Sequence, residues 1–135
     1  MWIKKYDWLW IDDGAYVDET VKFKQGKIKT SVNWGVRIQG IVEIGEGVLV
    51  GHNATIVSAS HGIKKGIYVR NQRTTNKKII IEDDVYIGAG AIILGGNILK
   101  KGCVIGAGAV LTEDHIVGED EIWIGIPAIF MKKRA

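Results

Sequence analysis

The chain of 135 residues has the length of one domain, and its 47% hydrophobic content is enough for a buried core. Its 18 basic and 15 acidic side chains nearly balance, so it lacks the dense basic surface typical of nucleic-acid binding. A single cysteine, Cys103, excludes an internal disulfide framework and predicts a reducing compartment. We therefore expect one cytoplasmic domain with no nucleic-acid partner.

The N-terminal segment, residues 1–31, is rich in tryptophan and weak in any repeat. Its first ten residues contain three tryptophans: Trp2, Trp8 and Trp10. Asp7 interrupts the short apolar stretch there and no small-residue cleavage pattern follows, which argues against a signal peptide. No apolar run approaches the roughly 18 residues that cross a bilayer. We expect an aromatic cap over an irregular first coil, and no membrane insertion.

Residues 32–121 carry an aliphatic residue at every sixth position. The repeated residues are Val32, Ile38, Ile44, Val50, Ile56 and, after a break, Ile81, Ile87, Ile93, Leu99, Ile105, Leu111 and Val117. This period is neither that of a helix nor a simple strand alternation, so the chain must turn after each short strand. Three sides of six residues close a triangular coil of about 18, and stacked coils pair as parallel strands. The pattern predicts an all-β parallel β-helix.

The repeat fails at residues 62–78, and the spacing from Ile56 to Ile81 is one residue longer than four repeats. This stretch contains six cations and no acidic residue: Lys64, Lys65, Arg70, Arg73, Lys77 and Lys78. We expect an extruded loop. Its cations either form a solvated surface or meet an anionic ligand, and the sequence leaves both interpretations open.

The C-terminal segment, residues 122–135, holds the only proline, Pro127, and ends in the cations Lys132, Lys133 and Arg134. An apolar strip precedes these cations. Stacking that strip on the last coil would cap the prism, because a solenoid end otherwise leaves its core open to solvent. We therefore expect residues 122–135 to be a capping segment.

Four motifs follow one another at a characteristic spacing. They are residues 42–54 leading to 58–61, then 85–91, 104–112 and 125–128. In this order they resemble the hexapeptide-repeat acyltransferases, especially acetyl-CoA-dependent sugar O-acetyltransferases such as the galactoside and maltose enzymes. The resemblance covers residues 32–134. It implies left-handed coiling and a homotrimer with acetyl-CoA in the groove between neighbouring prisms.

The resemblance places a general base at His61. A neutral imidazole suits this role because it can take the proton of an acceptor hydroxyl as that oxygen attacks the thioester carbonyl. Glu43 lies 18 residues earlier, one expected coil away, so we hypothesise that its carboxylate orients the ring of His61. The alternative is that Glu43 is a solvated side chain on a coil face.

The resemblance also implies contacts with the donor. Ala89, Ala107 and Thr112 match positions that hold the pantetheine arm, where small residues let the arm approach the backbone. Lys132, Lys133 or Arg134, or the basic loop, are candidates for the phosphates, and ordinary solvation is the alternative. The family commonly has Lys after the Thr, whereas this chain has Glu113.

The acceptor positions depart from the galactoside-type enzymes. An acidic residue and an asparagine hold the sugar there, but the matching positions here are Gln39 and Ser31. Gly62 stands where those enzymes have proline. We expect these two positions, with Arg70 and Arg73 of the loop, to bind a glycan or glycan precursor rather than free galactoside or maltose.

Three rival functions remain. N-acetylation of an amino sugar or antibiotic uses the same donor, and a non-catalytic scaffold uses the repeat for assembly alone. A zinc carbonic anhydrase needs three histidine ligands, two of them closely spaced. His52, His61 and His115 contain no such pair, so no metal is expected. The sequence leaves the acceptor and the acyl length open.

Overall fold

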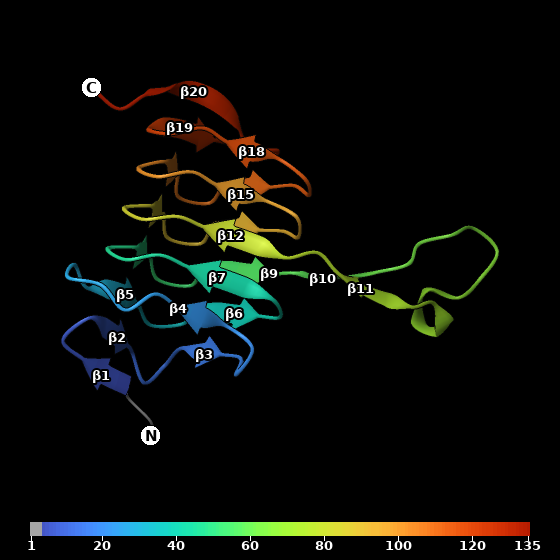
Figure 1. The fold of residues 1–135 in the computed structure, drawn as a ribbon. Coiled ribbons are helices and arrows are strands. Elements are labelled where there is room, and N and C mark those ends of the chain that lie inside the picture. Colours follow the sequence, from blue (N-terminus) through green and yellow to red (C-terminus); the bar gives the residue numbers. More distant parts are fainter. Residues whose placement is uncertain (1–3) are drawn as a thin grey trace.

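The computed structural model describes residues 4–135, which form a stack of triangular coils with one hairpin projecting from its side (Figure 1). Three sheets make the faces of the prism. Face A contains β1 (Lys4–Tyr6), β2 (Leu9–Ile11), β5 (Thr30–Val32), β8 (Leu49–Val50), β13 (Tyr86–Ile87), β16 (Val104–Ile105), β19 (Glu121–Ile124) and β20 (Ile129–Lys133). Face B contains β3 (Tyr16–Val17), β6 (Arg37–Gln39), β9 (Thr55–Val57), β14 (Ile92–Ile93) and β17 (Val110–Leu111). Face C contains β4 (Lys22–Phe23), β7 (Val42–Ile44), β12 (Ile79–Ile81), β15 (Ile98–Leu99) and β18 (Ile116–Val117).

Each coil visits faces A, B and C in turn, and coils 1 to 5 begin at β2, β5, β8, β13 and β16. The turns between faces form three edges, A/B, B/C and C/A. Neighbouring strands within a face are parallel except at the two ends, where β1 and β20 pair antiparallel to β2 and β19. The parallel β-helix predicted from the six-residue period is confirmed, while its left-handed coiling stays a prediction.

The core is the set of aliphatic residues that the period predicts. All twelve repeated residues from Val32 to Val117 are buried, with exposed fractions of 3% or less. The repeated residue of each face points inward, and β7 and β12 on face C bury a second aliphatic side chain each, Val42 and Ile79. These residues form one continuous hydrophobic core. Such burial supplies most of the favourable free energy of folding.

The projecting hairpin explains the break in the repeat. Coils above it pair residues 18 apart, as Ile80 with Ile98, but Val42 pairs with Ile79, 37 positions later. The hairpin therefore adds 19 residues to coil 3, one more than a whole coil, which produces the slip of one residue. It comprises β10 (Ala59–His61), the short 3-10 helix η1 (Val69–Asn71) and β11 (Thr74–Asn76). It begins before the predicted boundary at residue 62.

Both ends of the prism are closed by aromatic or small side chains. Trp8 packs against the core at the first coil, whereas Trp2 lies outside the described residues. Trp123 and the buried Ala128 close the last coil. Within residues 4–135, no helix is long and apolar enough to cross a membrane.

A carboxylate on the C/A edge provides a test of how the coils are held together. Asp83 accepts a hydrogen bond from the backbone N–H of Glu46 at 2.9 Å and pairs with the Lys24 ammonium at 3.0 Å. These two contacts, the backbone bond first, lower the pKa of Asp83. The stability they contribute is therefore present above the ordinary carboxyl pKa and lost as the pH falls through the lowered value.

We expect Asp83→Ala to lower the free energy of unfolding by about 1 kcal/mol at pH 7, since the lost bonds are partly exposed. The difference from the wild type should shrink in denaturant titrations below about pH 4, where the wild-type carboxyl is increasingly protonated. A difference that stays constant down to pH 2 would show that the carboxylate charge contributes nothing.

Candidate functional site

The hairpin holds His61 outside the prism. β10 and β11 pair antiparallel, with His61 opposite Thr74, and the Gly62 N–H donates to the Arg73 carbonyl at 3.0 Å. His61 Nε2 and the Thr74 hydroxyl oxygen lie 3.5 Å apart. The His61 side chain is exposed, and its other ring nitrogen has no partner among residues 4–135. The ring is therefore free to meet a substrate.

A groove begins where this hairpin leaves the prism. It has a volume of about 540 Å³ and is lined by Asp18, Thr20, Gln39, Gly40, Ile41, Val57, Ala59 and Asn76. Ala59 pairs with Asn76 two positions from the His61–Thr74 pair. Side chains two apart on a strand share one side of the ribbon, so His61 lies on the same side of the hairpin as this lining. The histidine therefore faces the same side of the hairpin as Ala59 and Asn76 of the groove.

The floor of the groove is a network of hydrogen bonds. Asp18 accepts from the Tyr16 hydroxyl at 2.7 Å and from the Gly40 N–H at 2.8 Å. These bonds, the Tyr16 one first, lower the pKa of Asp18, so its carboxylate stays ionised at neutral pH. The Thr20 hydroxyl donates to the Gly40 carbonyl at 2.6 Å. The groove thus offers carboxylate, hydroxyl and amide groups, which suit a ligand rich in hydroxyls.

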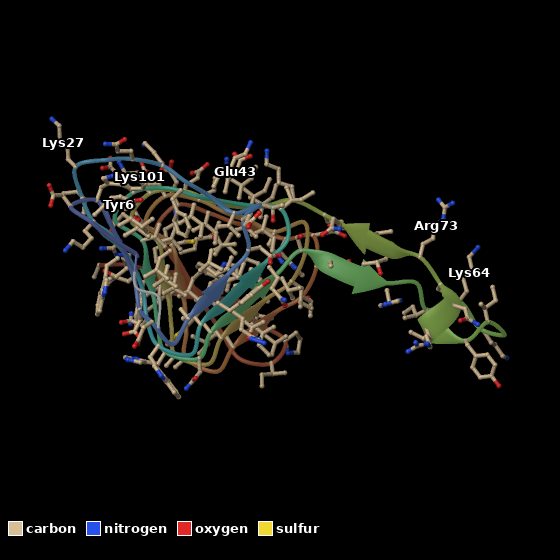
Figure 2. The ribbon with its side chains drawn as sticks, turned by 90° about the horizontal axis from the view of Figure 1, so that it is seen from below. Tyr6, Lys27, Glu43, Lys64, Arg73 and Lys101 are labelled. Atoms are coloured by element: carbon tan, nitrogen blue, oxygen red, sulfur yellow. The ribbon has the colours of Figure 1, made fainter. Side chains whose placement is uncertain are left out.

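Glu43 lies on the prism (Figure 2), whereas His61 belongs to β10 of the hairpin. It pairs with Ile80 on face C and forms an ion pair with Lys78. The predicted juxtaposition with His61 is wrong, because the chain leaves the stack after Ser58 and residue 61 never enters coil 3. Glu43 instead lines a separate groove of about 600 Å³ over face C. That groove is larger, and Lys24 and Asp83 in its lining form an ion pair, but its lining does not include the histidine.

The positions implied for the pantetheine arm lie on two edges. Ala89 and Ala107 are exposed one above the other on the A/B edge, and the Gly108 N–H donates to the Ala89 carbonyl at 2.8 Å. A Cβ built on Gly90 or Gly108 would meet no atom within 4 Å, so this edge is open to a thin ligand. Thr112 lies across β17 on the B/C edge.

The C-terminal cations lie on the far side of face A from Ala107. Lys132 and Lys133 belong to β20, opposite Ile122 and Glu121. The Arg134 guanidinium donates to Asp84 and to the Gly102 carbonyl, each at 3.0 Å, which fixes it on the C/A edge. Within one chain these cations therefore do not join the edge of Ala89 and Ala107.

The remaining acceptor candidates are dispersed. Gln39 lines the groove, whereas Ser31 lies in β5 on face A. Arg70 belongs to η1, and Arg73 extends from the hairpin into solvent (Figure 2). Exposed apolar side chains surround these cations at the tip, among them Ile63 and Tyr68 at 83% and 84% exposure. Only Gln39 is placed beside the groove.

Neither a metal site nor a thiol site is present in the described part of the chain. No group of three or more potential ligands among residues 4–135 is arranged to hold a metal ion. His52, His61 and His115 lie on the A/B edge, the hairpin and the B/C edge. Cys103 is buried, and burial raises the pKa of its thiol to about 12, so it is not a nucleophile at neutral pH.

Sequence reasoning missed Asp18 and Asn76 of the groove lining, and it named Lys77 only as one cation of the loop. The 18-residue spacing does not align Asp18 with the later coils, because coil 1 is longer. Tyr16 pairs with Arg37, 21 positions later. Asn76 and Lys77 stand at the end of the insertion, where no spacing applies. The failure of the repeat marked their neighbourhood, but only the pairing of β10 with β11 places them.

Residues 78–113 match the family described as hexapeptide repeat of succinyl-transferase. The chain is 36% identical over 90 residues to a galactoside O-acetyltransferase of Lactococcus lactis subsp. lactis (strain IL1403), covering 67% of this chain and 42% of that protein. It is 32% identical over 90 residues to gamma carbonic anhydrase 2, mitochondrial, of Arabidopsis thaliana, covering 67% and 25%.

Among solved structures, the fold is similar to a hexapeptide-repeat-containing acetyltransferase of Vibrio cholerae O1 biovar eltor, complexed with acetyl coenzyme A. The TM-score is 0.77 at 27% sequence identity, and the match covers 88% of this chain and 64% of that one. The chain spans less than half the length of the curated relatives described above. The two curated relatives are named for different activities, an O-acetyltransferase and a carbonic anhydrase.

Proposed function

The chain belongs to the hexapeptide-repeat family, and we propose that it is an acetyl-CoA-dependent O-acetyltransferase acting on a hydroxyl of a sugar or glycan precursor. The observation that carries this proposal is the position of His61. A histidine free at one ring nitrogen stands on the side of the hairpin that lines a polar groove. A proton acceptor beside a site suited to hydroxyl groups is the arrangement that O-acetylation requires.

His61 acts as the general base in this proposal. Its free ring nitrogen takes the proton of the acceptor hydroxyl as that oxygen attacks the thioester carbonyl, and the imidazolium returns the proton to the departing thiolate. Acetyl-CoA supplies the activated acetyl group. Thr74, 3.5 Å from His61 Nε2, restricts the rotation of the ring. No metal takes part in the reaction.

The acceptor lies in the groove of Asp18, Gln39 and Asn76. An ionised carboxylate accepts hydrogen bonds from sugar hydroxyls, while amide side chains both donate and accept. Hydrogen bonds with Gly40 hold Asp18 and Thr20, and one from the Ser58 hydroxyl holds Asn76, so these three side chains are fixed before binding. Ser31 lies on face A and does not contact the acceptor bound in the groove of its own chain. Arg70 and Arg73 of the hairpin extend the site toward a charged portion of the acceptor.

Acetyl-CoA lies along the A/B edge at Ala89 and Ala107, between two copies of the chain. His61 projects from the B/C edge of its own prism, so a second copy must bring its A/B edge to the hairpin. This requirement supports the homotrimer, and the exposed apolar residues of the hairpin tip would be covered there. Thr112, Lys132 and Lys133 then contact the donor only from a neighbouring copy. We place the assembly in the cytoplasm.

Transfer to an amine is the second candidate, since the ionised Asp18 in the groove also suits an ammonium group. The two functions are separated by incubating the protein with acetyl-CoA and matched sugars that differ in one hydroxyl or amino group. Release of free thiol with the hydroxyl compounds, and an acetylated product cleaved by hydroxylamine as an ester, is the expected result. A product that forms only from amino sugars and resists hydroxylamine would contradict O-acetylation.

A further inference from the structure

Lys77 joins the hairpin to a coil that is not its neighbour. It follows β11 directly, and its ammonium donates to Glu113 at 2.8 Å and to Asp114 at 2.6 Å. Both carboxylates belong to the B/C edge of coil 5, whereas the hairpin interrupts coil 3. The Lys77 side chain and these carboxylates therefore meet over coil 4, on the outside of the prism.

Two glycines of coil 4 leave room for this contact. A Cβ on Gly95 would lie 3.2 Å from Lys77 Cβ, and one on Gly96 would lie 3.4 Å from Lys77 Cδ. The backbone adds to the attachment, since the Gly96 N–H donates to the Lys77 carbonyl at 3.0 Å. The aliphatic part of Lys77 thus lies in a notch where coil 4 has no side chains.

Asn76, the residue before Lys77, is linked through Ser58 to coil 2, on the other side of coil 3. The Ser58 hydroxyl, from a side chain only 1% exposed, donates to Asn76 Oδ1 at 2.8 Å and accepts from the Ile41 N–H of coil 2 at 2.8 Å. The Lys77 N–H closes the base of the hairpin on the Ser58 carbonyl at 3.0 Å. The hairpin is therefore attached to coil 2 through Asn76 and Ser58, and to coil 5 through Lys77.

We infer that Lys77 is a positioning residue, a clamp that fixes the hairpin and thereby sets His61 over the acceptor groove. The inference rests on the proposed function for its kinetic consequence, because the positioned group is the proposed base. It also gives Glu113 a role: with Asp114 it holds the clamp, which explains an acidic residue where the family commonly has Lys. A surface ion pair adds little stability, so its effect should be on geometry rather than on folding.

The test compares Lys77→Met with Lys78→Met. Lys78 is the adjacent cation, paired with Glu43 on face C, and serves as the matched control. We expect Lys77→Met to lower kcat about ten- to a hundredfold, the loss that small misplacement of a catalytic group produces, with KM for acetyl-CoA within about twofold. Amide hydrogen exchange of β10 and β11 should accelerate about tenfold. Lys77→Arg should recover most of the kcat, and Lys78→Met should match the wild type.

Unchanged kcat and unchanged hairpin exchange in a folded Lys77→Met protein would overturn the inference. So would a raised KM for acetyl-CoA at unchanged exchange, which would make Lys77 a ligand contact. Hydrogen exchange needs no turnover, so it separates this inference from the proposed function. If the wild type transfers no acetyl group, hairpin exchange that is faster in Lys77→Met but not in Lys78→Met still supports the clamp. Equal hairpin exchange in the two variants refutes it.

Discussion

His61→Ala should reduce the turnover of acetyl-CoA and acceptor by about 10²- to 10⁴-fold, the usual contribution of a general base. The fold should not change, because the imidazole is exposed and, among residues 4–135, its ring nitrogens make no polar contact shorter than the 3.5 Å one with Thr74. Steady-state thiol release measures the effect on kcat, and circular dichroism with thermal unfolding measures the fold. Acetyl-CoA binding measured by calorimetry should stay near the wild-type value, since the proposed donor edge lies on another part of the prism.

Ser60→Ala is the matched control for this prediction. Ser60 is the adjacent residue of β10 and pairs with Thr75, so its side chain lies on the other side of the hairpin from His61. Wild-type turnover is expected. If His61→Ala keeps more than about a tenth of the wild-type kcat, a loss far below that of a general base, the base must be sought elsewhere.

Replacing residues 58–78 by Gly-Gly should abolish acetyl transfer and leave the prism intact. The replacement copies the B/C turn of coil 4, where Gly95 and Gly96 stand between β14 and β15. It removes the 19 additional residues, so Ile56 and Ile81 become neighbours in the six-residue repeat. Turnover should fall at least as far as in His61→Ala, because the base, Asn76 and Lys77 leave together.

Circular dichroism and cooperative thermal unfolding are the measures of the prism in this shortened chain. A matched control replaces the same residues by a single glycine, which moves every later aliphatic residue out of register and should prevent folding. A Gly-Gly chain that is unfolded would show that the hairpin is required for the prism. A folded Gly-Gly chain with substantial turnover would show that the hairpin is not part of the active site.

The prism could be predicted from the sequence because one local rule is repeated. Each coil must bury one aliphatic side chain per face, so positions such as Ile38, Ile87 and Leu111 are fixed by spacing alone. All of them are buried as predicted. Closely packed parallel strands then follow, since the backbone groups of each coil find partners only in adjacent coils.

The candidate site could be predicted only in part, because it lies where the repeat is interrupted. The resemblance predicts His61 as the base and Gln39 as an acceptor contact, and the structure places Gln39 in the groove lining. The spacing of 18 failed for Glu43, since the hairpin leaves the stack before residue 61. It failed for Asp18 because coil 1 is three residues longer than a regular coil. Lys77 reaches coil 5 by a side-chain contact that no backbone spacing encodes.

The most direct test of acetyl transfer is a single measurement on the wild-type protein. Acetyl-CoA labelled in its acetyl group is incubated with a panel of sugars and glycan precursors, and label in the acceptor is compared with free thiol released. For an O-acetyltransferase we expect equal amounts of thiol and of acetyl ester on at least one hydroxyl acceptor. Bound acetyl-CoA with no label transferred to any hydroxyl would contradict this expectation.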